Sequence, residues 1–192
     1  MTPDILVMGV GRSGTTFAAM VLHEQFGVCF GHHHTMYTEF RGEPIYEDEW
    51  LKEHLNDLVL GRNKVDGFLE YFGESHERCE AKLRGIKLLD LAILSVEQLK
   101  ELKPKLVVRC YRGRESCCQS WVRYNGRDIG WAYKYYDDRE YRLREFSACH
   151  ALPVLTVMLD PLVHRVGEPE MVGMLGQYLG RVGLLTTQEQ VG

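Results

Sequence analysis

Hydrophobic positions along the chain fall into five short runs, and longer polar or amphipathic stretches separate them. Short apolar runs are typical of buried strands, and the stretches between them can form crossover helices. The predicted strands are Ile5–Val10, Val28–Phe30, Gly85–Leu89, Leu106–Tyr111 and Val154–Leu159. This alternation predicts an α/β protein of three layers, in which helices flank a central parallel sheet of about five strands.

Helical segments follow several of these runs. The pattern predicts helices over Phe17–Gln25, Ser95–Leu102 and Glu168–Leu179. Ser95 and Gln98 have the spacing of a capping box, which marks the start of the second of these helices. The whole chain, 1–192, is predicted to form a single domain, because 192 residues with 45% hydrophobic content fit one core. A long insertion at about 31–83, with an acidic patch at 43–50, separates the second and third strands.

The segment between the first strand and the first helix is predicted to bind phosphate. Residues 9–16 read Gly-Val-Gly-Arg-Ser-Gly-Thr-Thr, with the spacing of the P-loop that binds nucleoside triphosphates. Glycines allow backbone N–H groups to approach an anion, and the helix N-terminus adds partial positive charge. Arg12 adds a forked cation that suits phosphate or sulfate oxygens. Thr15 stands where the triphosphate loop carries lysine. The loop therefore keeps its anion cradle but lacks the lysine that contacts the β- and γ-phosphates.

A second cationic element runs from Arg109, within the fourth predicted strand, to Arg127. Its members are Arg109, Arg112, Arg114, Arg123 and Arg127. Arg112 ends the strand, and Ser120 lies eight residues later in the next helical stretch. In open parallel sheets, ligands bind beyond the carboxyl ends of the strands. Arg112 and Ser120 are therefore expected to converge on a second anion beside the first.

Two anion sites of this kind resemble those of the sulfotransferase family, whose donor is 3′-phosphoadenosine 5′-phosphosulfate (PAPS). The resemblance implies a P-loop-like fold and an anion site for the 5′-phosphosulfate at Arg12, Ser13, Gly14, Thr15 and Thr16. It also implies that Arg112 and Ser120 bind the 3′-phosphate. Arg12 in place of lysine is closer to the carbohydrate-modifying and bacterial branches than to the cytosolic branch. The closing C-terminal Arg-Lys-Gly segment of that cytosolic branch is absent from this sequence.

The resemblance further implies a catalytic base on the loop after the second strand. His34 is the first choice, with His33 and Glu39 as alternatives. Histidine suits the role because its ordinary pKa of about 6.5 allows it to accept a proton from an alcohol at neutral pH. A metal site at the histidine triplet is the less favoured interpretation, because three consecutive side chains do not face one ion on regular structure.

Lys87 has two interpretations. It ends an otherwise apolar strand, and buried strand positions rarely hold lysine without a partner. As a catalytic residue it would help to neutralise the sulfuryl group together with Arg12. Alternatively it is an edge lysine that reaches solvent. No metal is expected in this scheme, since no convincing carboxylate pair for Mg²⁺ is evident.

The leading hypothesis is thus a PAPS-dependent sulfotransferase that acts on a hydroxyl of a carbohydrate or small-molecule acceptor, and the insertion at about 31–83 is expected to shape the acceptor site. A P-loop nucleotide or small-molecule kinase and a non-catalytic protein that binds a bisphosphate nucleotide are the alternatives. The formal net charge of −4 argues against general nucleic-acid binding. No long apolar segment predicts a membrane span, and a cytoplasmic location is expected. The six cysteines are accordingly expected to be reduced thiols.

Overall fold

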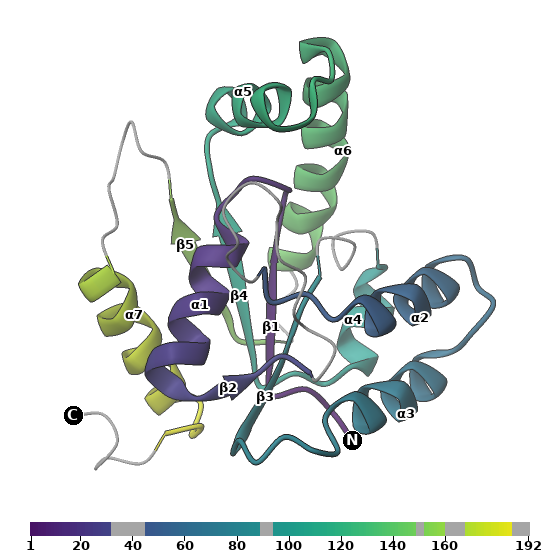
Figure 1. Ribbon diagram of the computed structural model, residues 1–192, viewed down its shortest axis with the longest axis vertical. Coiled ribbons are helices and arrows are strands. Elements are labelled where there is room, and N and C mark those ends of the chain that lie inside the picture. The colour runs from purple at the N-terminus through teal and green to yellow at the C-terminus, as the bar shows by residue number, and fades with distance from the viewer. Residues whose placement is uncertain (32–44, 89–93, 149–151, 160–167, 186–192) are drawn as a thin grey trace.

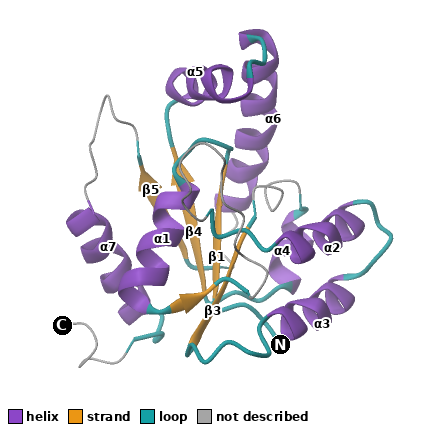
Figure 2. Ribbon diagram, in the orientation of Figure 1, coloured by secondary structure: helices purple, strands orange, loops and turns teal. Residues whose placement is uncertain are grey.

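The computed structural model describes residues 1–31, 45–88, 94–148, 152–159 and 168–185. Five strands form one sheet in the order β2-β3-β1-β4-β5, and every pairing is parallel. The strands are β1 (Ile5–Gly9), β2 (Val28–Cys29), β3 (Leu83–Lys87), β4 (Leu106–Tyr111) and β5 (Val154–Met158). The predicted α/β fold with a central parallel sheet of five strands is therefore confirmed (Figure 2).

The central strand β1 pairs with β3 on one side and with β4 on the other. Ile5 of β1 pairs with Gly85 on β3 and with Leu106 on β4. All five residues of β1 are buried, as expected for a strand covered on both faces. Since the strands are parallel, the carboxyl ends of β1, β3 and β4 lie at the same edge. This is the edge at which ligands bind in open α/β sheets.

One face of the sheet is covered by α1 (Thr15–Phe26) and α7 (Glu168–Arg181), which lie together on one side of the sheet in Figure 1. Their apolar side chains, among them Leu22 and Leu175, pack with Val7 of β1 in one hydrophobic cluster. This burial explains why two helices far apart in sequence share a face.

In the described part of the chain, the other face is covered by α2 (Glu49–Val59), α3 (Val65–Ser75), α4 (Val96–Glu101) and α6 (Ile129–Ser147). α5 (Arg114–Asn125) packs against α6 beyond the end of the sheet (Figure 1). Leu55, Phe68 and Phe146 are fully or almost fully buried in a second cluster, which includes Leu6 and Met8 of β1. The helices on the two faces and the sheet between them form the predicted three layers (Figure 1).

Most predicted elements lie within about two residues of the observed bounds. The capping box is present at α4, where Gln98 N–H donates to Ser95 Oγ at 3.1 Å and Ser95 N–H donates to Gln98 Oε1 at 2.9 Å. The sequence pattern predicts one helix in the insertion, over Leu51–Leu60, and the structure has two, α2 and α3. Gly67 and Gly73 weaken the helical pattern of α3 in the sequence, and burial of Phe68 and Phe72 stabilises the helix instead.

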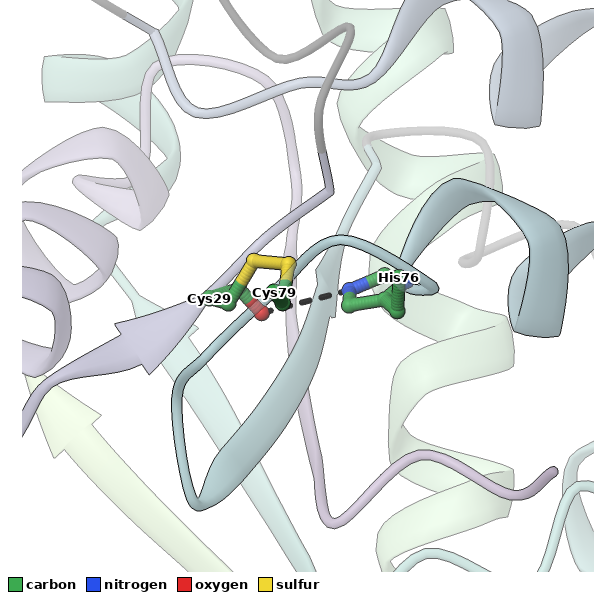
Figure 3. Close-up of side chains that lie close together, drawn as sticks. All are labelled: Cys29, His76 and Cys79. Carbon is green, nitrogen blue, oxygen red and sulfur yellow. Dashed lines mark hydrogen bonds between the residues drawn. A yellow bond between two sulfur atoms is a disulfide. The ribbon is translucent and has the colours of Figure 1, made fainter.

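The expectation of reduced thiols is wrong for two of the cysteines. Cys29 and Cys79 form a disulfide across 50 residues, with their Cα atoms 6.3 Å apart. Cys29 ends β2, and Cys79 lies in the connection between α3 and β3 (Figure 3). Cys110, Cys117 and Cys118 are buried thiols outside any disulfide. Among the described helices, none has both the length and the apolar character needed to cross a membrane.

Candidate functional site

The phosphate loop follows β1 directly and turns sharply before α1. Arg12 has φ 72° and Gly14 has φ 95°, so both adopt the left-handed conformation. Ser13 N–H donates to the carbonyl of Val10 at 2.9 Å, which closes the turn. The first turn of α1 then begins with the bond from Ala18 N–H to the carbonyl of Gly14 at 3.1 Å. The loop therefore delivers the chain into a helix N-terminus, as an anion cradle requires.

Neighbouring elements leave no room for side chains at the loop glycines. A Cβ at Gly9 would lie 2.6 Å from the carbonyl oxygen of Cys110, and one at Gly11 would lie 2.4 Å from the ring of Trp121. A Cβ at Gly14 would lie 2.3 Å from the side chain of Leu159. The loop is thus packed against the ends of β4 and β5 and against α5. Glycine is needed here for close approach as well as for backbone conformation.

The structure brings together the residues predicted for the two anion sites. Arg12 Nε donates to Ser120 Oγ at 3.2 Å, and the guanidinium of Arg112 donates to the carbonyl oxygen of Arg12, also at 3.2 Å. The Arg12 guanidinium lies 4.5 Å from the centre of the Tyr124 ring, a cation–π contact. Residues more than 100 positions apart therefore form one cationic cluster beside the phosphate loop.

The hydroxyl residues of the loop have different positions. Ser13 is buried, its Oγ lies where a Cβ of Gly9 would be, and it has no hydrogen-bond partner among the described residues. Thr15 is buried as well, whereas Thr16 is partly exposed at the start of α1. Ser13 and Thr15 thus pack within the loop. Thr16 has the more accessible of the three hydroxyls for a ligand.

The cationic stretch that follows β4 is divided by its partners on α6. Arg109 is buried and forms a salt bridge with Glu140, and it also donates to Ser147 Oγ at 3.1 Å. Arg114 makes two hydrogen bonds of 2.6 Å to the Asp137 carboxylate, which hold the pKa of that carboxyl below its usual range. No salt bridge joins Arg112 to a carboxylate within the described parts of the chain. Arg112 is therefore the member of the stretch that faces the phosphate loop.

The interpretation of Lys87 as an edge lysine that reaches solvent is wrong, because its side chain is buried. Its ammonium lies 2.6 Å from Glu47 Oε1, and the two side chains are only 3% and 4% exposed. Burial lowers the pKa of Lys87, and the Glu47 carboxylate acts in the opposite direction. Glu47 could not be identified from the sequence as the partner of Lys87. The signal was a strand lysine that requires an acid, but the patch at 43–50 offered several carboxylates.

Asp48, the neighbour of Glu47, fixes the start of α2 to the rest of the fold. Its carboxylate accepts from Leu51 N–H at 3.1 Å, which caps the helix, and it also accepts a hydrogen bond from Ser75 Oγ at the end of α3. Gly31, with φ 103°, lies so close that a Cβ there would be 2.3 Å from Asp48 Oδ2. These contacts attach the α2–α3 pair to the chain that leaves β2.

The residues predicted as catalytic base lie outside the described residues. This applies to His34 and to both alternatives, His33 and Glu39. The predicted role of the insertion in acceptor binding likewise remains a prediction. Among the predicted functional residues that the structure describes, Arg12, Arg112 and Ser120 lie together, whereas Lys87 lies with Glu47.

Comparisons with known proteins were made on sequence and on structure. No family model matches the chain, and no curated protein matches its sequence. Among solved structures it is similar to deoxyadenosine kinase from M. mycoides with bound dATP, with 13% identity and a TM-score of 0.43. That alignment covers 92% of this chain and 98% of the kinase chain. A likeness of this size carries no argument about activity, so the site itself must support the functional assignment.

Proposed function

We propose that this protein is a sulfotransferase that transfers a sulfuryl group from PAPS to a hydroxyl of a carbohydrate or small-molecule acceptor. The observation that carries the proposal is the meeting of Arg12, Arg112 and Ser120 beside a phosphate loop that lacks lysine. A donor with phosphate groups at both its 5′ and 3′ positions needs two such neighbouring anion sites. A nucleoside triphosphate needs only one extended site.

The loop and the α1 N-terminus would bind the 5′-phosphosulfate. Arg12 and the partly exposed Thr16 are placed to donate to its oxygens, and the N-terminal end of α1 favours negative charge. Arg112 and Ser120 would bind the 3′-phosphate. These donors would stabilise the charge that develops on adenosine 3′,5′-bisphosphate as the sulfur–oxygen bond breaks.

The transfer also requires alignment and a base. The acceptor oxygen would attack sulfur in line with the leaving phosphate oxygen, and its proton would pass to His34, which stays the first choice for the base. Lys87 as a catalytic cation also stays a proposal. To contact a sulfuryl oxygen, its ammonium would have to share or exchange the 2.6 Å contact with Glu47.

The second candidate is a nucleotide or small-molecule kinase. The spacing from Gly9 to Thr16 favours it, because Thr16 stands at the hydroxyl position of the triphosphate loop. Phosphoryl transfer of this kind also needs Mg²⁺ carboxylates and a cation at the position that Thr15 occupies. A protein that binds the bisphosphate without catalysis is the third candidate.

Calorimetric titration with adenosine 3′,5′-bisphosphate, and separately with ATP and Mg²⁺, tests the proposal. We expect the bisphosphate to bind at least about tenfold more tightly, which corresponds to about 1.4 kcal/mol. Tighter binding of ATP would overturn the proposal in favour of the kinase. Tight bisphosphate binding, followed by an acceptor screen with labelled PAPS, separates the sulfotransferase from the non-catalytic candidate.

A further inference from the structure

A second cluster of reactive side chains lies at the sheet edge, away from the phosphate loop. Figure 3 shows Cys29 at the end of β2, His76 at the end of α3, and Cys79 in the connection to β3. The ligand atoms of these three residues all lie within 4.8 Å of one another. His76 is fully buried, while both cysteines are partly exposed. In the structure, the two sulfurs form the disulfide described above.

The hydrogen bonds of His76 give its ring a definite orientation. Nδ1 lies 3.0 Å from the carbonyl oxygen of Phe72, and Nε2 lies 3.2 Å from the carbonyl oxygen of Cys29. A ring with one proton can donate to only one of these oxygens. Donation from Nδ1 to Phe72, the shorter contact, leaves a lone pair on Nε2. This nitrogen faces the carbonyl oxygen of Cys29 in the disulfide form, so the ring must turn from that oxygen toward the nearby sulfurs when it binds a metal. A backbone carbonyl that accepts from one ring nitrogen is the usual support for a histidine that ligates a metal with the other.

We propose that the reduced form of this cluster binds a zinc ion through Cys29 Sγ, Cys79 Sγ and His76 Nε2. Two thiolates and one imidazole are ligands that Zn²⁺ prefers, and water can complete the tetrahedron. Zinc–sulfur bonds of about 2.3 Å place two thiolates about 3.8 Å apart. Side-chain rotation can supply this separation at a Cα–Cα distance of 6.3 Å, so the backbone need not move.

An acidic opening beside the cluster offers a path for the cation. A cavity of about 480 Å³ is lined by His76 and by three glutamates of the same segment, together with Arg84. The glutamates are Glu70, Glu74 and Glu77. Carboxylates at the mouth of a cavity raise the local concentration of cations. The cavity reaches the cluster at His76, and the two cysteines are partly exposed, so a cation can approach the set of ligands.

The disulfide is then the metal-free, oxidised form of the same site. Zinc binding displaces one proton from each thiol. A peroxide would oxidise the two thiolates by two electrons: the sulfur–sulfur bond forms, the oxygen–oxygen bond breaks, and two protons complete the two water or alcohol products. Zinc is released because a disulfide is no longer a thiolate ligand. A dithiol reductant reverses the step by thiol–disulfide exchange and becomes a disulfide itself.

Metal titration of the full-length chain in its two redox forms tests this proposal without any substitution. We expect the phosphine-reduced protein to bind one Co²⁺ with a thiolate-to-cobalt charge-transfer band, and Zn²⁺ to displace it. The disulfide form should bind neither ion at this site. Hydrogen peroxide should release the zinc, and peptide mass spectrometry should find Cys29 joined to Cys79. Equal binding by the two redox forms, or no thiolate band in the reduced form, would overturn the proposal.

Substitutions then locate the site. Cys79→Ser and His76→Gln should each weaken zinc binding by more than about 100-fold, since even groups that only orient metal ligands contribute about 10- to 100-fold. Cys118→Ala, a buried thiol of α5, and His54→Gln, a ring that stacks on Tyr71, are matched controls that should keep full affinity. Circular dichroism checks that each variant is folded. Loss of binding in the controls, or its retention in folded Cys79→Ser, would place the metal elsewhere.

Discussion

Beside the phosphate loop, Arg112 donates to a backbone carbonyl and Arg12 contacts a hydroxyl and an aromatic ring. At the end of β3, on the other side of β1, Lys87 is instead buried against a carboxylate. Both regions lie at the carboxyl edge of the sheet, and both place cations on strand ends. They differ in the described partners of the cations: Arg112 donates to a backbone carbonyl at the loop, whereas Lys87 at β3 pairs with the Glu47 carboxylate.

The difference shows which cations are suited to a ligand and which to the fold. A buried cation that is already paired has its charge compensated, and removing its partner is costly. A partly exposed arginine beside a helix N-terminus keeps its favourable interaction for an incoming anion. The charges of Arg109 and Arg114 are compensated in the same way as that of Lys87, since both have carboxylate partners on α6. Closeness in sequence to Arg112 is thus a weaker indication of ligand binding than the contacts of each cation.

Removal of the buried cation should give the largest effect. Lys87→Met leaves Glu47 buried without its partner, and the expected loss in free energy of unfolding is about 3–5 kcal/mol by denaturant titration. The double variant Lys87→Met/Glu47→Gln should recover most of it. Lys52→Met is the control, because that ammonium lies 3.9 Å from Glu47 on a side chain that is 38% exposed. A loss below about 1 kcal/mol for Lys87→Met would remove the contrast between the two regions.

Removal of a loop-side cation should change ligand binding and leave the fold intact. Arg112→Ala is expected to weaken adenosine 3′,5′-bisphosphate about 10- to 100-fold, because hydrogen bonds to charged groups contribute about 1.5–3 kcal/mol. Binding of adenosine 5′-phosphate should change little, and the free energy of unfolding should stay within about 0.5 kcal/mol. Calorimetry and denaturant titration measure these quantities. Arg114→Ala, which loses the pairing with Asp137 and the cation–π contact with Tyr133, is the control. Equal losses for both ligands in Arg112→Ala would refute the 3′-phosphate assignment.

A smaller effect is expected where the loop packs under α5. Gly11→Ala places a Cβ 2.4 Å from the Trp121 ring, so either the ring or the loop must move. Overpacking of this kind costs about 1–3 kcal/mol, which thermal or denaturant unfolding would detect. The double variant Gly11→Ala/Trp121→Leu should recover part of the loss.

The control for this substitution lies in α7. Gly173→Ala meets no atom within 4 Å and should stabilise the protein by about 0.5–1 kcal/mol, because alanine favours a helix interior over glycine. If Gly11→Ala left both stability and bisphosphate affinity unchanged, close packing between the loop and α5 would not constrain the site.

Much of the fold could be predicted because its signals are local. Buried parallel strands appear as continuous apolar runs, so all five were found, and Ser95 with Gln98 marked the start of α4. The glycine pattern likewise predicted the loop. α3 was missed because its stability comes from packing of Phe68 and Phe72, which no short-range pattern reveals.

The candidate site, like the fold, was predictable only in part. Arg112 and Ser120 could be selected because each follows from its position at a strand end or in the next helix, and the structure places them with Arg12. The packing of Trp121 on Gly11 could not be predicted from the sequence, since it depends on how α5 lies over the loop. His34 remains a prediction from the sequence.

The sequence by itself determined the strands, the phosphate loop and the absence of its lysine, because these depend on residues within a few positions of one another. Only the tertiary structure decided the strand order, the burial of Lys87 against Glu47, and the meeting of Cys29 with Cys79 and His76. Each of these joins residues about 40 to 50 positions apart or depends on the pairing of distant strands. Such contacts form only when burial of the whole sheet stabilises the approach of distant segments.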